Sequence, residues 1–244
     1  MRQRLFNPWG VAVTGALRHA VIMPAAILLA AGMGTRMRSA LPKAMHPLGG
    51  RPMLRHLLAA VEQVFDTVVV VVGPGMERLA ALVAPHAVVV QAERLGTAHA
   101  AGMAAPVLRG YAGDVAVLYA DNPLITAATM ARLMAASADI ALLAMRPADP
   151  AKYGRVVTVG AAVQRVVEWA DASAAERAIG LCNAGVIRAP AARLFGWLDA
   201  VRNDNAAGEF YLPDVIGLAV EDGARCLVVE APEAELRGIN SRSA

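Results

Sequence analysis

Aromatic and charged side chains are scarce in this chain of 244 residues, at 5% and 18% of the sequence. Proteins that bind nucleic acid need dense basic surfaces or aromatic platforms, so the net charge of +3 does not indicate a nucleic-acid partner. Long apolar runs are missing too, since none approaches the roughly 18 to 20 uncharged residues that cross a bilayer. The 57% hydrophobic content is divided among short runs. This pattern predicts a buried sheet and no membrane association.

Only two cysteines are present, Cys182 and Cys226, with neither CxxC spacing nor a nearby histidine. They indicate reduced, buried thiols in a cytoplasmic protein. The first 22 residues begin with basic and small apolar residues, but Arg18 and His19 interrupt the apolar run and no clean cleavage site follows. We therefore interpret residues 1–22 as an irregular extension upstream of a start at Met23, with a targeting role as the alternative.

Short apolar runs alternate with helix-like segments in the first part of the chain. The predicted strands are 25–31, 67–72, 87–91, 114–121 and 140–145, and the predicted helices begin at Pro52, run over 97–108 and begin near Thr126. This rhythm predicts a parallel sheet covered by helices. After Pro147 the predicted strands lie closer together (RVVTV, QRVVEW, NAGVIRA and CLVVE), with helices from Pro190 and near Tyr211. We expect this part to form a mixed α/β subdomain.

The segment from Leu29 to Gly50, LAAGMGTRMRSALPKAMHPLGG, is rich in glycine and positive charge. The first acidic residue of the chain is Glu62, so the segment keeps its whole positive field. It follows the first predicted strand, where open parallel sheets bind ligands. Gly32 and Gly34 allow backbone N–H groups to approach phosphate oxygens, and later side chains add a hydroxyl and charge (Thr35, Arg36, Arg38 and Lys43). We therefore predict an anion site.

Two common phosphate-binding motifs do not fit this segment. A Walker loop needs Gly-Lys followed by Ser or Thr, whereas Thr35 and Arg36 follow Gly34. A dinucleotide fingerprint needs a third glycine, where Met37 stands, and a later acidic residue. Of 23 cationic side chains only Lys43 and Lys152 are lysines. A compact ammonium suits phosphate oxygens approached from varied angles, so we interpret Lys43 as a phosphate ligand.

LAAGMGTRM followed by LPK resembles the signature of sugar-1-phosphate nucleotidyltransferases, which cytidylyltransferases of isoprenoid synthesis share. Further motifs follow in order: QAERLGTAHA, LYADNPLI, YGRVV, VVEWADA, NAGV, GEFYLPD and RGINSR. Over residues 25–242 they together resemble the N-terminal uridyltransferase (pyrophosphorylase) domain of the bifunctional bacterial N-acetylglucosamine-1-phosphate uridyltransferase/glucosamine-1-phosphate acetyltransferase. The resemblance implies a Rossmann-like, mostly parallel α/β sheet flanked by helices. In this interpretation residues 23–244 form one nucleotidyltransferase domain, with a nucleotide-binding half at 23–147 and a sugar-binding half at 148–244.

The resemblance also implies an activity: uridylyl transfer from UTP to N-acetylglucosamine-1-phosphate, giving UDP-N-acetylglucosamine and pyrophosphate. Arg36 and Lys43 would neutralise the triphosphate. The nucleotide would be bound by the loop residues and a later motif (Leu29, Ala30, Ala31, Gly32, Gly34, Thr35, Gln91, Gly96 and Thr97). The sugar would be surrounded by Tyr119, Ala120, Gly154, Glu168 and Asn183. Asp121 and Asn240 would bind Mg²⁺, whose shell typically includes one or two protein oxygens.

Some residues depart from the family pattern. Ala120 stands where glycine is common, Trp169 and Ala170 stand where His-Lys is common, and Pro213 replaces a usual threonine. No hexapeptide β-helix follows, so the resemblance predicts no acetyltransferase activity and gives no basis for trimerisation. Two alternatives remain open. One is transfer to another sugar-1-phosphate, such as N-acetylmuramate-1-phosphate, and the other is a non-catalytic module that binds UDP-sugars.

Overall fold

The structure is a computed structural model that describes residues 23–34, 37, 39 and 41–239. The predicted extension at 1–22 lies outside the described residues. So do three predicted site residues, Thr35, Arg36 and Asn240.

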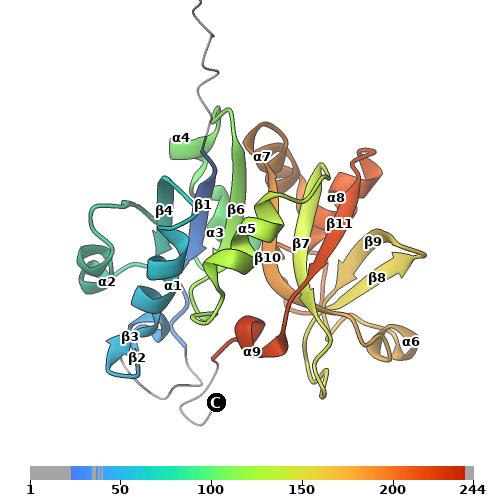
Figure 1. The fold of residues 1–244 in the computed structure, drawn as a ribbon, viewed down its shortest axis with the longest axis horizontal. Helices are drawn as coiled ribbons and strands as arrows, with labels where there is room; N and C mark the ends of the chain where they lie inside the picture. The colour runs from blue at the N-terminus through green and yellow to red at the C-terminus, as the bar shows by residue number, and fades with distance from the viewer. Residues whose placement is uncertain (1–22, 35–36, 38, 40, 240–244) are drawn as a thin grey trace, which may run out of the picture.

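The described chain is built on a nine-stranded sheet (Figure 1). Seven strands follow the order β11-β7-β10-β6-β1-β4-β5. They are β1 (Ala25–Leu29), β4 (Thr67–Val72), β5 (Ala87–Val90), β6 (Asp114–Tyr119), β7 (Ile140–Met145), β10 (Cys182–Pro190) and β11 (Cys226–Glu230). All pairs among them are parallel except those of β10, which runs antiparallel to β6 and β7. The amino end of β10 therefore lies at the same edge as the carboxyl ends of its neighbours.

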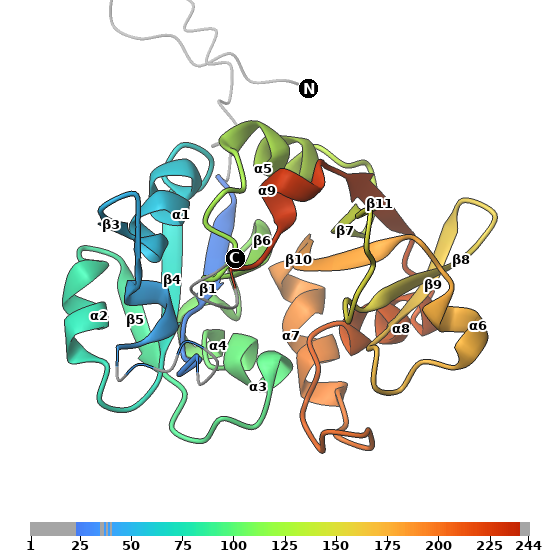
Figure 2. The ribbon, with the colours of Figure 1, turned by 90° about the horizontal axis from the view of Figure 1, so that it is seen from below.

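The remaining strands form two small additions. β8 (Arg155–Val159) and β9 (Ala162–Val167) make an antiparallel pair that joins the sheet through β10. β2 (Pro47–Leu48) and β3 (Arg51–Pro52) form a separate hairpin. Figure 2 views the molecule from the carboxyl edge and shows the first part of the chain beside the β8–β9 part.

Side chains of the central strands alternate between two apolar cores, because successive residues of a strand point to opposite faces. In β1, Ala25 and Ile27 belong to one core, and Ala26 and Leu28 to the other. The same alternation holds in β4, β6 and β7, whose residues are almost all fully buried. A sheet buried on both faces needs helices on both faces.

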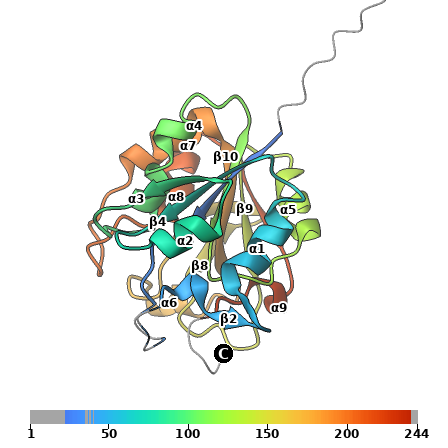
Figure 3. The ribbon, with the colours of Figure 1, turned by 90° about the vertical axis from the view of Figure 1, so that its left-hand side faces the viewer.

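Helices cover both faces, as Figure 3 shows. One core is closed by α3 (Thr97–Gly102), α4 (Ala105–Leu108), α7 (Ala191–Ala200) and α8 (Asp214–Glu221). The other is closed by α1 (Met53–Val61), α2 (Glu77–Leu82), α5 (Ala127–Met134) and α9 (Glu233–Leu236). Two short helices, η2 (Lys43–Met45) and α6 (Ala174–Arg177), lie outside this covering set. The predicted fold class is confirmed.

The predicted helix over 97–108 is divided in two. α3 ends at Gly102, and α4 begins at Ala105 with a proline in its first turn. Proline lacks an N–H group and fits the first turn of a helix but not its interior, so Pro106 favours a new helix start. Elsewhere the predicted starts are close: α5 begins after Thr126, whose side chain accepts a hydrogen bond from Thr129 N at 3.2 Å. The boundary between halves at residue 147 stays a prediction.

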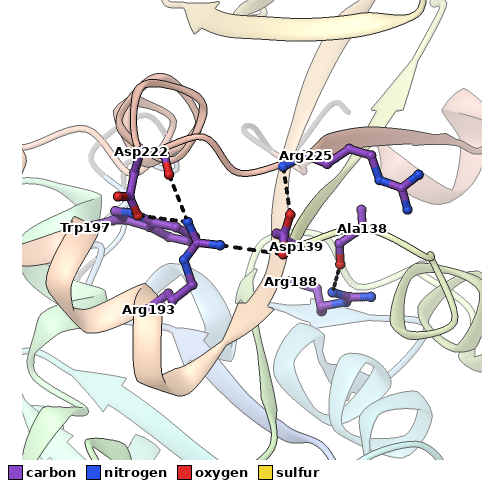
Figure 4. Close-up of polar contacts among 7 residues, drawn as sticks. All are labelled: Ala138, Asp139, Arg188, Arg193, Trp197, Asp222 and Arg225. Atoms are coloured by element: carbon purple, nitrogen blue, oxygen red, sulfur yellow. Dashed lines mark hydrogen bonds and ion pairs between the residues drawn. The ribbon is translucent and has the colours of Figure 1, made fainter.

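An ionic cluster joins elements at the edge opposite the carboxyl ends of the parallel strands (Figure 4). Asp139, just before β7, accepts a 2.8 Å hydrogen bond from the backbone N–H of Arg225, just before β11. Arg193 of α7 lies 3.5 Å from Asp139 and 2.8 Å from Asp222, and its guanidinium lies over the ring of Trp197. This cluster ties α7 and the end of α8 to the sheet.

A bulge in β10 depends on a glycine. The pairing of β10 with β7 shifts register between Asn183 and Ile187. Gly185 lies within the bulge at φ +77°, and a Cβ there would lie 2.2 Å from the Tyr119 ring.

We therefore expect Gly185→Ala to lower the free energy of unfolding by about 3 kcal/mol, because it adds both backbone strain and a clash. For a domain of this size the melting temperature should fall by roughly 6–12 °C, measurable by circular dichroism. Gly180→Ala is the matched control, because a Cβ there meets nothing within 4 Å. Equal melting temperatures for the two variants would contradict the assignment.

Candidate active site

A cleft of about 540 Å³ opens at the carboxyl ends of β1 and β6. Twelve of the predicted site residues line it: Leu29, Ala30, Ala31, Gly32, Gly34, Lys43, Gln91, Gly96, Thr97, Tyr119, Ala120 and Asp121. Leu29 and Tyr119 are register partners in the adjacent parallel strands β1 and β6. The loop that follows each strand therefore begins at the same edge, and residues about 90 positions apart in the sequence share one cleft.

The glycine loop brings Lys43 into this cleft. Gly34 has φ +62°, and a Cβ on it would lie 2.7 Å from Cβ of Lys43. A side chain at position 34 would therefore displace the stem of the lysine. Gly32, by contrast, has open space around its Cα. The sequence pointed to backbone approach at both glycines, and the structure adds the close packing of Gly34 against Lys43.

Lys43 and Asp121 form an ion pair across the cleft. Lys43 Nζ lies 2.5 Å from Asp121 Oδ2, and both side chains are largely but not fully buried. The other carboxylate oxygen, Oδ1, is buried and has no hydrogen-bond partner among the described atoms. The backbone carbonyl of Asp121 accepts a 2.9 Å hydrogen bond from Ile239 N, which brings the chain preceding position 240 to this strand end.

Gln91 is held at the back of the cleft by its amide nitrogen. The side chain is buried, and its Nε2 lies 3.0 Å from both Gly96 O and His99 Nδ1. These contacts occupy the amide nitrogen, and the side chain lines the cleft. Gly96 has φ +123°, and a Cβ there would lie 2.4 Å from Phe210 O, so this position requires glycine.

Tyr119 is the last residue of β6 and lines the cleft. Burial raises the pKa of its phenol well above the usual range, with smaller contributions from Glu168 and Asp121, while a hydrogen bond with Thr97 opposes the rise. Tyr119 is therefore a neutral hydrogen-bonding group at physiological pH. Its ring packs on Gly185 of β10.

Three predicted sugar-binding residues lie together outside the residues that line the cleft. Asn183 N donates a 2.9 Å hydrogen bond to Gly154 O, and a Cβ on Gly154 would lie 3.1 Å from Glu168 Oε1. Burial, followed by the Asp214 and Asp171 carboxylates, raises the pKa of Glu168. Burial and Asp171 raise the pKa of Asp214 to about 6. The carboxylates of Asp171 and Asp214 therefore lie close enough to Glu168 to act on it electrostatically.

The cleft also contains residues that the sequence did not single out. Arg94 Nε donates a 2.8 Å hydrogen bond to Ala31 O. The Arg94 guanidinium also packs on Gly73, where a Cβ would lie 2.4 Å from Arg94 Nη2. Glu209 lines the cleft as well. Both lie inside quoted motifs, QAERLGTAHA and GEFYLPD, so motif membership was the available signal. Ala44 and Ala100 complete the lining.

Other sequence-based expectations concern metal ligands, thiols and membranes. Within the described ranges no group of three His, Cys, Asp or Glu side chains is arranged to hold a metal. Cys182 and Cys226 are buried and unpaired with each other, which confirms the prediction of buried thiols, and burial raises the pKa of both. Among the described helices, none is long and apolar enough to cross a membrane.

Comparison with known proteins places the cleft in a family context. Residues 26–184 match the family described as MobA-like NTP transferase domain. The Bifunctional protein GlmU of Gluconacetobacter diazotrophicus is 62% identical over 226 residues, covering 89% of this chain and 49% of that protein. The Bifunctional protein GlmU of Gluconobacter oxydans is 56% identical over 221 residues, with the same coverage of 89% and 49%. The chain therefore spans about half the length of these curated relatives.

A solved structure shows the same fold. The inositol-1-phosphate CTP transferase from T. maritima superposes with a TM-score of 0.73 and 18% identity, over 91% of both chains. The glycine loop and the strand end at Asp121 both lie within the residues that match the family. The chain therefore belongs to the MobA-like NTP transferase domain family.

Proposed function

We propose that this chain transfers a uridylyl group from UTP to N-acetylglucosamine-1-phosphate, giving UDP-N-acetylglucosamine and pyrophosphate. The observation that carries the proposal is the Lys43–Asp121 pair in a cleft at the carboxyl ends of β1 and β6. In this pair, Lys43 provides a cation for phosphates, and Asp121 provides a carboxylate for a metal. The similarity to two Bifunctional protein GlmU sequences over 89% of the chain supports this direction.

The nucleotide occupies the half of the cleft formed by β1 and the segment after β5. The backbone N–H groups of Ala31 to Gly34 bind phosphate oxygens, and Lys43 and Arg36 neutralise the triphosphate. The Gln91 carbonyl oxygen accepts a hydrogen bond from N3–H of uracil, while its Nε2 stays with Gly96 and His99. Cytosine carries an acceptor at N3, so this arrangement favours UTP over CTP.

The sugar phosphate occupies the other half, near Tyr119. Glu168 and Asn183 supply an acceptor and an amide for sugar hydroxyl and N-acetyl groups, and Gly154 leaves room beside Glu168. Phenol, carboxylate and amide groups in one region suit a neutral polyhydroxylated ligand. The sugar's phosphate end then faces Lys43.

The reaction needs no protein nucleophile. An oxygen of the sugar phosphate, already ionised, attacks the α-phosphorus of UTP, and the bond from that phosphorus to the bridging oxygen breaks as pyrophosphate leaves. Lys43 holds the triphosphate in place, and Tyr119 stays protonated and donates a hydrogen bond. The transfer requires that the chain's residues place the two substrates in line and neutralise the charge of the phosphates.

Mg²⁺ is the metal that we propose for this site. Asp121 would hold it through the buried oxygen Oδ1, which has no partner among the described atoms, together with Asn240. Hard oxygen donors of this kind fit Mg²⁺. The ion would neutralise charge on the phosphates and polarise them for attack.

The alternative substrate N-acetylmuramate-1-phosphate carries an additional carboxylate. Burial, followed by repulsion from neighbouring carboxylates, raises the pKa of Glu168 and Asp214. A further carboxylate in this region would add to that repulsion. The charges beside the predicted sugar site therefore favour the N-acetylglucosamine substrate.

We expect pyrophosphate release only when UTP, N-acetylglucosamine-1-phosphate and Mg²⁺ are all present. A coupled phosphate assay should cross UTP, CTP, GTP and dTTP with the sugar phosphates of N-acetylglucosamine, N-acetylmuramate and glucose. Turnover with N-acetylmuramate-1-phosphate should be at least about tenfold slower, because it places one more negative charge beside Asp171 and Asp214. Binding of UDP-N-acetylglucosamine without turnover of any pair would instead identify a non-catalytic module.

A second prediction concerns Asp121→Asn, which keeps the size of the side chain and removes its charge. We expect kcat to fall by at least about 100-fold, because the metal loses its anionic ligand. Calorimetry should show weaker Mg²⁺ binding in the presence of UTP. The melting temperature should change little, since one partly exposed ion pair contributes about 1 kcal/mol.

Asp66→Asn serves as the control for this variant. Asp66 is exposed and directly precedes β4, so it lies at the opposite edge of the sheet. Unchanged Mg²⁺ affinity in Asp121→Asn, with the control behaving as the unmodified chain, would refute the role given to Asp121.

A further inference from the structure

Trp169 lies beside the proposed sugar-binding residues and makes an unusual set of contacts. The guanidinium carbons of Arg155 and Arg177 lie 4.9 and 4.8 Å from the centroid of its indole ring. Arg177 also donates through Nε and Nη2 to the backbone carbonyl of Trp169, at 3.3 and 3.2 Å. We call Arg155, Trp169 and Arg177 the indole clamp.

The clamp is closed by a contact between its two arginines. Arg155 Nε donates to the backbone carbonyl of Arg177 at 3.3 Å. Arg155 is the first residue of β8 and only 1% exposed, and its other donors reach the carbonyls of Pro150, Ala151 and Tyr153. The clamp therefore fixes three segments against one another: the loop before β8, the turn after β9 and the end of α6.

Glu168 lies in the middle of the clamped structure. It directly precedes Trp169, and its carbonyl accepts a 3.0 Å hydrogen bond from Asp171 N. Its carboxylate lies against Gly154, which directly precedes Arg155. The neighbours of Glu168 and Gly154 in sequence are thus both members of the clamp.

Negative charge lies close to Glu168, which would favour movement of its carboxylate if the turn were not held. Asp171 and Asp214 repel its carboxylate, and a carboxylate on an unrestrained turn would move toward solvent. Two cations over the indole hold the turn without pairing with Glu168 itself. Within the described chain neither Arg155 nor Arg177 forms an ion pair with a carboxylate.

We propose that Trp169 is a positioning residue that, through the indole clamp, holds the Glu168 carboxylate in place to bind the sugar of the sugar-phosphate substrate. This inference rests on the proposed function. Trp169 acts through Glu168 and not by contact with the sugar.

The first test compares Trp169→Ala with Trp169→Phe, which keeps an aromatic face for the two guanidinium groups. We expect Trp169→Ala to raise KM for N-acetylglucosamine-1-phosphate about tenfold, as loss of two cation–π contacts implies, with KM for UTP unchanged. Trp169→Phe should keep KM for the sugar phosphate close to that of the unmodified chain. An unchanged KM for the sugar phosphate in Trp169→Ala would overturn the proposal.

Arg177→Ala and Arg193→Ala form a matched pair of controls. Each removes a guanidinium that lies over a tryptophan ring, Arg177 in the clamp and Arg193 over Trp197 at the opposite edge of the sheet (Figure 4). Arg177→Ala should raise KM for the sugar phosphate by about threefold or more. Arg193→Ala should lower the melting temperature and leave both KM values unchanged. A similar KM shift in both variants would show a general loss of stability and refute the assignment.

A double-mutant cycle tests whether Trp169 acts through Glu168. If it does, Trp169→Ala should add less than about twofold to the KM of Glu168→Gln. Independent, multiplying effects would show that Trp169 contributes by itself and would overturn the proposal.

Hydrogen exchange gives a readout that needs no substrate. The amides of Asn183 and Asp171 bond to Gly154 O and Glu168 O, so they should exchange about tenfold faster in Trp169→Ala but not in Trp169→Phe. The Ala30 amide, bonded to Val71 O, should not change. If the unmodified chain turns over no sugar phosphate, the proposed function fails, and the clamp is then judged by this exchange alone. Unaltered exchange at Asn183 and Asp171 would refute it.

Discussion

The ion pair between Lys43 and Asp121 forms only if several separate features of the fold are in place. Asp121 is delivered by β6 and Lys43 by the loop after β1, and the two strands must be adjacent and parallel for these ends to meet. The lysine stem also requires that Gly34 carry no side chain. With 14% and 25% of the two side chains exposed, the ion pair itself adds little stability, and its importance is that it places the two charges together. The register of the sheet and the conformation of Gly34 are therefore both needed for the contact between Lys43 and Asp121.

In the proposed function, the nucleotide and the sugar would bind in surroundings of different charge. Lys43 and Arg94 line the cleft, whereas Glu168 and Asp214 lie outside its lining, and burial, followed by neighbouring carboxylates, raises the pKa of both acids. In that proposal, a sugar phosphate, which has a charged end and a neutral end, would bind with its phosphate toward the lysine. β10 makes this arrangement possible, because its reversed direction brings Asn183 to the edge where β6 ends.

The sequence predicted elements whose signal is local and strong. The valine run of β4 and the apolar strand β7 have the predicted bounds, because β-branched and fully buried runs indicate strands. The hairpin of β2 and β3 and the short helices α2, α6 and α9 have too few residues to show a period, and they were not predicted. In the site, the composition of the loop identified Gly34 and Lys43. Their mutual packing, the role of Arg94 and the contacts of Arg155 depend on residues that only the fold brings together.

Two buried arginines show how the chain handles a cation inside the protein. Arg188 of β10 donates to the carbonyls of Ala138 and Met134 and lies 3.4 Å from the Asp114 carboxylate. Arg155 also binds carbonyls, but the indole of Trp169 stands where a carboxylate would otherwise compensate its charge. In the proposed function, a salt bridge from Arg155 to Glu168 would remove that carboxylate from the sugar. An aromatic face stabilises a cation through its quadrupole and carries no net charge. In that proposal the indole stabilises the Arg155 cation, and Glu168 remains available for the sugar.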